Sequence, residues 1–113
     1  AETVPIHALS FDGIDTATRE LLDRLEAACN ARERLAIDYL DLAGVETRRV
    51  VRPLGLHYWG RVWTLAGWCE LRSGFRTFRV DRIRVTEEVG RFRPDRDKSL
   101  AAYYELQRRE AGL

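Results

Sequence analysis

The sequence of 113 residues has no methionine, only two cysteines and no apolar run long enough to cross a membrane. Without even an initiator methionine, the polypeptide is expected to be a processed or excised piece of a longer protein. The first residues, AETVP, lack the basic start and the apolar stretch of a signal peptide. We therefore expect a cytoplasmic protein without a membrane partner.

The two cysteines, Cys29 and Cys69, are forty residues apart and belong to no CxxC or His–Cys spacing. In a cytosolic protein such a pair does not predict a disulfide, and no spacing here predicts a metal site. Nucleophilic catalysis would need Cys69 paired with His57 and an orienting third group, and no such motif is present. The sequence therefore predicts that the protein is not an enzyme and uses no cofactor or metal.

Composition is typical of one globular domain with a modest core, because 45% of the residues are hydrophobic and 33% are charged. Residues 1–14 show no clear period, and we expect them to form an extended arm. Residues 15–113 are expected to form a single domain.

Hydrophobic periodicity predicts a helix, several short strands and a second helix. Pro53 and Gly55 must bend or interrupt one strand, and Ser73-Gly74 is typical of a hairpin turn. Several short, strongly bent strands after one helix predict a mainly β fold, a small SH3-like or Sm-like β-barrel with an N-terminal and a C-terminal helix. The expected helices cover residues 16–35 and a stretch from 97 or 99 to 111, and the expected strands cover 36–42, 46–58, 62–72 and 77–87.

Arginines are interleaved with strand-forming residues between positions 49 and 92, and five arginines meet one acid, Asp81, from Arg72 to Arg84. Alternation along the third strand places Trp63 and Leu65 inward and leaves Trp68 on the other face. In the fourth strand the inward parity slips between Val80 and Ile83, which predicts a β-bulge or sharp bend near 81–82.

Such a sheet suits an anionic ligand, since guanidinium groups match phosphates and an aromatic face stacks a nucleobase. We therefore expect a concave basic and aromatic patch that binds an anionic effector. Its candidate residues are Tyr39, Arg49, Tyr58, Trp68, Arg76, Arg79 and Arg82. The alternative is that salt bridges to the nearby acids neutralise these arginines and leave a solvated face without a ligand. Those acids are Asp38, Asp41, Glu70 and Asp81.

Four segments, in this order and spacing, resemble the WYL domain, a regulatory module found behind a winged helix-turn-helix in bacterial transcription factors. They are Tyr39, then RVVRPLGL from Arg49, then Trp63-Thr64-Leu65, then RTFRVDRI from Arg76. The match covers roughly residues 25–95. One departure is Thr64, which stands where the family has a tyrosine, so the ring of that tyrosine is missing.

The resemblance implies the Sm-like form of the barrel, a covalently linked helix-turn-helix DNA-binding domain in the full protein, and a homodimer. It also implies a sensor of nucleotides or single-stranded nucleic acid. An alternative function is an Sm-like module that binds RNA directly or drives oligomerisation, since arginine-rich faces hold single strands without sequence preference.

Overall fold

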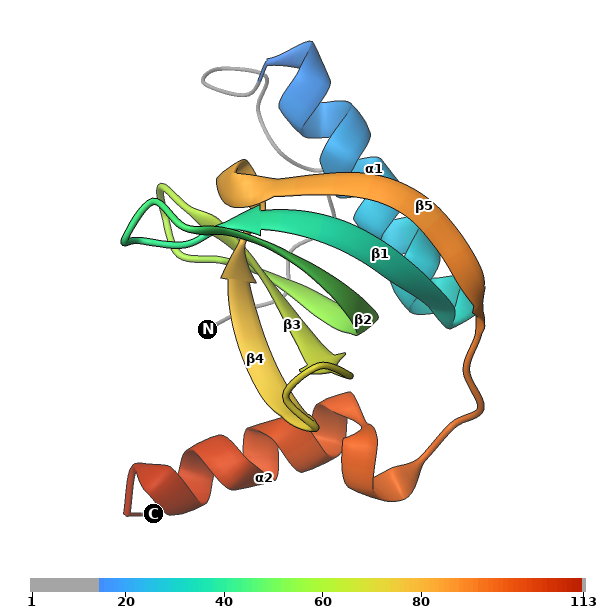
Figure 1. Ribbon diagram of the computed structural model, residues 1–113. Helices are drawn as coiled ribbons and strands as arrows, with labels where there is room; N and C mark the ends of the chain where they lie inside the picture. The colour runs from blue at the N-terminus through green and yellow to red at the C-terminus, as the bar shows by residue number, and fades with distance from the viewer. Residues whose placement is uncertain (1–14, 113) are drawn as a thin grey trace.

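The computed structural model describes residues 15–112, so the arm expected over residues 1–14 lies outside the described part of the chain. The boundary of a single domain over residues 15–113 stays a prediction. The elements, shown in Figure 1, are α1 (Thr16–Ala31), β1 (Glu33–Leu40), β2 (Glu46–Tyr58), β3 (Trp63–Cys69), β4 (Gly74–Arg79), the 3-10 turn η2 (Val80–Arg82), β5 (Ile83–Arg91), the 3-10 turn η3 (Arg96–Lys98) and α2 (Leu100–Glu110).

The strands form one antiparallel sheet in the order β4-β3-β2-β1-β5. The prediction of a mainly β fold with a helix at each end is confirmed. The predicted closure into a barrel is not confirmed, because β4 and β5 are the two edges of the sheet and do not pair with each other. After β4 the chain turns through η2 and returns to pair with β1, on the far side of the sheet, so the ladder stays open.

Helix α1 is shorter than the sequence predicts. Its N-cap is Asp15, whose side chain accepts a hydrogen bond from the backbone N–H of Thr18 at 2.6 Å. It ends at Arg32, whose φ of 54° is left-handed and stops the helical hydrogen bonds. Leu35, which the periodicity places in the helix, therefore lies in β1, where it is fully buried.

Strands β2 and β3 bend where the sequence places Pro53 and Gly55. The pairing register shifts between these two residues, so one residue of β2 bulges out of the ladder. Opposite the bulge lies Gly67, where an added Cβ would stand 2.6 Å from Cγ1 of Val51. Only glycine fits so close an approach, and the bend it allows keeps the sheet strongly curved.

The slip of parity predicted between Val80 and Ile83 is real, and its cause is η2, which occupies residues 80–82. The stretch expected as one strand, residues 77–87, is therefore two strands, β4 and β5. Val80 and Ile83 are both buried, with 1% and 8% of their surface exposed, because the 3-10 turn rotates the chain between them.

Strand registers define two faces of the sheet. The inner face carries side chains that alternate along each strand and stand opposite one another between strands: Ile37, Tyr39, Arg49, Val51, Leu65, Cys69, Arg76 and Phe78. Helix α1 packs its buried Leu22, Leu25 and Ala28 into the same core as this face. Helix α1 lies mainly against β2 and β1.

The outer face carries Trp68 and Phe75, which stand opposite each other on β3 and β4. Helix α2 lies against this side, beneath β3 and β4 in Figure 1. Ser99 caps α2 by accepting a hydrogen bond from the N–H of Ala102 at 3.1 Å. The hydroxyl of Tyr103, a buried residue of α2, lies 2.9 Å from the hydroxyl of Thr77 on β4. Within residues 15–112 no helix is long and apolar enough to span a membrane.

Candidate functional site

Three side chains from three strands meet on the inner face, at the end of β4 that leads into η2. Phe78 is buried, with 1% of its surface exposed, and the ring of Tyr39 meets it edge-on with centroids 5.0 Å apart. The guanidinium of Arg49 lies over the Phe78 ring, 5.7 Å from its centroid. The Tyr39 hydroxyl also accepts a hydrogen bond at 3.1 Å from the backbone N–H of Arg79.

Arg49 has no carboxylate partner among residues 15–112. Its Nε donates to Oγ1 of Thr47 at 3.1 Å, and its Nη1 approaches Sγ of Cys69 at 3.9 Å. A hydroxyl and a thiol are both neutral, so the positive charge of this half-buried arginine is not compensated. We call the group formed by Tyr39, Arg49 and Phe78 the inner-face cluster.

Two further predicted residues share the inner face with this cluster. Arg76 stands opposite Gly67 on the edge strand β4 and is exposed, and its Nη1 donates to the carbonyl of Phe75 at 2.7 Å. Tyr58 packs its ring 5.0 Å from that of Trp63 and donates its hydroxyl hydrogen to the carbonyl of Gly60. Neither Arg49 nor Arg76 forms an ion pair with an acid among the described residues. The side chain of Arg76, however, lines a pocket with Trp68, Phe75 and Tyr103 at the β4 edge, away from the inner-face cluster.

Arg79 and Arg82 differ from this pair because the structure uses their side chains locally. Arg79 forms two hydrogen bonds with Asp81, at 3.0 and 2.7 Å, and they lower the pKa of the Asp81 carboxyl. Arg82 donates from Nη1 to the carbonyl of Asp41 at 3.0 Å and reaches that of Leu40 at 3.4 Å. It therefore ties η2 to the turn between β1 and β2.

Trp68 lies on the outer face, as the alternation predicts, and so does not meet Arg49 across the sheet. Its ring meets that of Phe75 edge-on at 5.1 Å, and the ammonium of Lys98 lies 5.1 Å from its centroid. The seven predicted residues therefore do not form one patch. Four of them lie on the inner face, two alternate to the outer face, and Arg82 belongs to η2.

Salt bridges, the alternative weighed from the sequence, exist for three of the four acids named. Asp38 pairs with Arg48 and Arg84, and the hydrogen bond from Arg48 is the main reason why its pKa is lowered. Glu70 pairs with Arg34 and Arg52. The remaining two acids are Asp81, which holds Arg79, and Asp41, whose carboxylate accepts the N–H groups of Ala43 and Val45.

Sequence reasoning missed the partners that make the inner-face cluster distinct. It assigned Phe78 to the core alone, although Arg49 and Phe78 share an inward parity that a pairing register would have revealed. It also missed that Thr64, where the family has tyrosine, accepts a hydrogen bond from Nε1 of Trp59 at 2.8 Å. An indole from the neighbouring turn is thus fixed beside the position that lacks the ring.

The cysteine–histidine pair weighed for catalysis does not form, because Cys69 lies on the inner face and His57 stands opposite Thr64 on the outer face. His57 is 2% exposed and hydrogen-bonded to the Tyr104 hydroxyl, and burial lowers its pKa. Burial also raises the pKa of the Cys29 thiol to about 12, so this cysteine is not a nucleophile at neutral pH.

Comparison with known proteins gives two findings. The family described as "WYL domain" matches residues 20–88. A solved structure with a similar fold is that of proteasome accessory factor B/C (PafBC) of Arthrobacter aurescens, with a TM-score of 0.64 and 23% sequence identity. The similarity covers 85% of this chain but 14% of that one, so this chain spans about one seventh of the length of the protein it matches.

Proposed function

Because this chain belongs to the WYL domain family, we propose that it is the ligand-sensing regulatory domain of a bacterial transcriptional regulator. In this proposal a helix-turn-helix DNA-binding domain is covalently linked to it in the full protein, which acts as a cytoplasmic homodimer. The domain itself performs no catalysis. The fold shared with PafBC, a much longer chain, supports the idea that the domain works as one part of a larger protein.

We further propose that the effector is an anion, a nucleotide or a short single strand of nucleic acid, and that it binds at the inner-face cluster. The observation that carries this proposal is the guanidinium of Arg49, held over the Phe78 ring without a carboxylate partner among the described residues. A partly buried charge without a counter-ion attracts an anion more strongly than a charge on the open surface, because solvent screens it less.

The chemistry of the neighbouring residues fits a phosphate-bearing ligand. Arg49 supplies a guanidinium group, whose planar fork matches two phosphate oxygens. Tyr39 supplies an aromatic ring, and its hydroxyl touches the backbone of Arg79. A ligand that formed a hydrogen bond with this hydroxyl would compete with the backbone N–H of Arg79. Binding would thereby change the backbone at the junction between β4 and η2.

Two variants test the site. Arg49→Gln removes the uncompensated charge, and Arg79→Gln removes an arginine that Asp81 already neutralises. Binding of a fluorescent single-stranded oligo(dT) of eight to twelve nucleotides, a length that one OB-fold domain typically binds, is measured by fluorescence polarisation at two salt concentrations. We expect Arg49→Gln to weaken binding by about tenfold or more and Arg79→Gln by less than about threefold.

The proposal fails if wild-type protein does not bind the oligonucleotide or other nucleotides, or if both variants weaken binding equally. Thermal melts of each variant serve as the control for folding.

An alternative function, an Sm-like module that binds RNA directly or oligomerises, is favoured by one observation. The two edge strands β4 and β5 stay open, and an open edge is a template for pairing with another chain. A sensor needs an attached effector domain, whereas a module that binds RNA directly needs only self-association, so a helix-turn-helix upstream of Ala1 in the full open reading frame would favour the sensor.

A further inference from the structure

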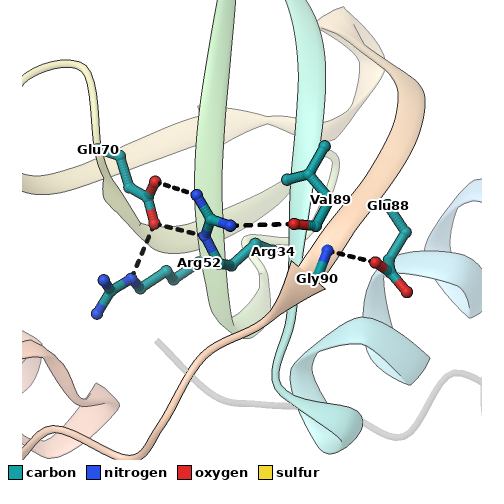
Figure 2. Close-up of polar contacts among 6 residues, drawn as sticks. All are labelled: Arg34, Arg52, Glu70, Glu88, Val89 and Gly90. Atoms are coloured by element: carbon teal, nitrogen blue, oxygen red, sulfur yellow. Dashed lines mark hydrogen bonds and ion pairs between the residues drawn. The ribbon is translucent and has the colours of Figure 1, made fainter.

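A cationic groove lies on the outer face, away from the inner-face cluster. Its floor is formed by side chains of β1 and β2 and by Glu70, directly after β3, and its wall by the chain that leaves β5 and runs to η3. Figure 2 shows Arg34, Arg52 and Glu70 beside this departing segment. The groove has a volume of about 470 Å³, and its lining residues are Arg34, Arg52, Glu70, Arg91, Phe92, Arg93, Pro94, Asp95 and Lys98.

Positive charge is concentrated in this groove. Among its described lining residues five are cationic and two are acidic, whereas the whole chain has a net charge of only +1. Arg91 and Arg93 are exposed and meet no carboxylate within residues 15–112, and Asp95 is 3.6 Å from Lys98. A concave surface lined by one sign of charge focuses the field and attracts a counter-ion of the opposite sign.

Glu70 orders the floor of the groove. Both of its carboxylate oxygens accept hydrogen bonds from Arg34, at 2.7 and 2.9 Å, and one also accepts from Nε of Arg52 at 3.0 Å. Arg34 is fixed further by a hydrogen bond to the carbonyl of Val89 at 3.0 Å. With two arginines on one carboxylate, the floor keeps a surplus of positive charge after every ion pair has been counted.

Arg52 is held ready to bind an anion. Its guanidinium lies 5.6 Å from the centre of the Phe92 ring, and only its Nε is used by Glu70. In Figure 2 its two Nη groups point away from Glu70, and they meet no acceptor among the described residues. An arginine fixed by a ring and a carboxylate loses less conformational entropy on binding than a free one.

We propose that this groove is a second anion site, which binds a phosphate group through the Nη groups of Arg52 with Arg91, Arg93 and Lys98 around it. The phosphate belongs either to a small phosphorylated metabolite or to a strand of nucleic acid, since the guanidinium fork recognises both in the same way. The site is independent of the inner-face cluster, because the two lie on opposite faces of the sheet.

Two double variants of equal charge test the site. Arg91→Gln/Arg93→Gln removes two groove arginines, and Arg61→Gln/Arg72→Gln removes two exposed arginines outside both proposed sites. Binding of inorganic pyrophosphate is measured by isothermal titration calorimetry. We expect the groove variant to bind at least about tenfold more weakly than wild type and the matched control to change by less than about threefold.

Backbone amide NMR spectra of the 113-residue chain locate the site. With pyrophosphate we expect chemical-shift changes centred on residues 91–98 and on Arg52, and these changes should persist in the Arg49→Gln variant. The proposal is overturned if pyrophosphate shifts no amide there, if the shifts cluster around Tyr39 and Phe78, or if both double variants lose affinity equally. Shifts around Tyr39 and Phe78 would still support anion binding at the inner-face cluster, so this experiment distinguishes failure of one proposed site from failure of the other.

The source of the phosphate is distinguished by two trinucleotides, one with a 5′-phosphate and one with a 5′-hydroxyl. A preference of about tenfold for the phosphorylated form assigns the groove to a terminal phosphate. Equal affinity, above that for pyrophosphate, assigns it to the backbone of a strand.

Discussion

The two faces of this sheet treat arginine differently. On the inner face Arg49 rests on an aromatic ring beside a hydroxyl and a thiol, without an acid among the described residues. On the outer face Arg34 and Arg52 are locked by Glu70. The same side chain is therefore a free charge held by apolar packing in one region and a member of an ion-pair network in the other. A count of arginines cannot reveal which of these roles each one has.

The largest loss of stability is expected when a buried apolar side chain of the inner face is removed. Trp63 is 7% exposed and packs against Tyr58, so Trp63→Ala should lower the free energy of unfolding by about 3–5 kcal/mol. Trp59→Ala is the matched control, because the side chain of Trp59 is 54% exposed, and it should cost less than about 1 kcal/mol. Urea denaturation followed by circular dichroism measures both. Equal losses would show that the inner face does not depend on this core.

An intermediate effect is expected for the network on the outer face. Glu70→Gln leaves two partly buried arginines without their carboxylate and should cost about 2 kcal/mol at pH 7. Glu87→Gln, at an exposed position on β5, is the control and should be nearly neutral.

The pH dependence of the same variant tests the cause. Hydrogen bonds from Arg34, followed by those from Arg52, lower the pKa of Glu70 from 4.5 to about 2 in the folded chain. For a lowered pKa, the stabilisation is fully present above about pH 4.5 and is lost as the pH falls towards 2. The difference in unfolding free energy between wild type and Glu70→Gln should therefore shrink over this range. A difference that stays constant down to pH 2 would exclude the ion pairs as its source.

The smallest effect is expected for Arg79, whose partner Asp81 is exposed and only two residues away. Arg79→Ala should move the thermal midpoint by less than about 2 °C, because solvent screens exposed ion pairs and side-chain entropy offsets them. Differential scanning calorimetry at low and high salt measures the change. If Arg79→Ala lowered the thermal midpoint as much as Trp63→Ala does, Arg79 would contribute as much to stability as the buried Trp63.

Local patterns predicted the elements well because they depend on neighbours in sequence. The bounds of β2, the inward Trp63 and the irregularity near Asp81 all follow from spacing and from turn-forming residues. Helix α1 was overextended because the apolar period runs on through Leu35, and only the left-handed backbone at Arg32 stops it.

The candidate site was harder to predict because its arginines are sorted by tertiary partners. Glu70 binds Arg34, 36 residues away, and Arg52, 18 residues away. Helix and strand periodicity relates only residues that are near in sequence, so it could not predict either pair. Strand alternation does give Arg49 and Arg76 the same parity, once the register between β2, β3 and β4 is known, but it does not bring their side chains together. Closure of the barrel depends on strand tilt and stagger, which the sequence does not state.

The turn η2 has a mechanical consequence for the open sheet. It joins the two edge strands, β4 and β5, through three residues, so the last residue of β4 and the first of β5 lie at most about 14 Å apart. The separation of the two edges is therefore limited at the η2 end, whereas no such short connection joins the start of β4 to the end of β5. A further strand that inserts between β4 and β5 would therefore have to enter from the end of the sheet away from η2.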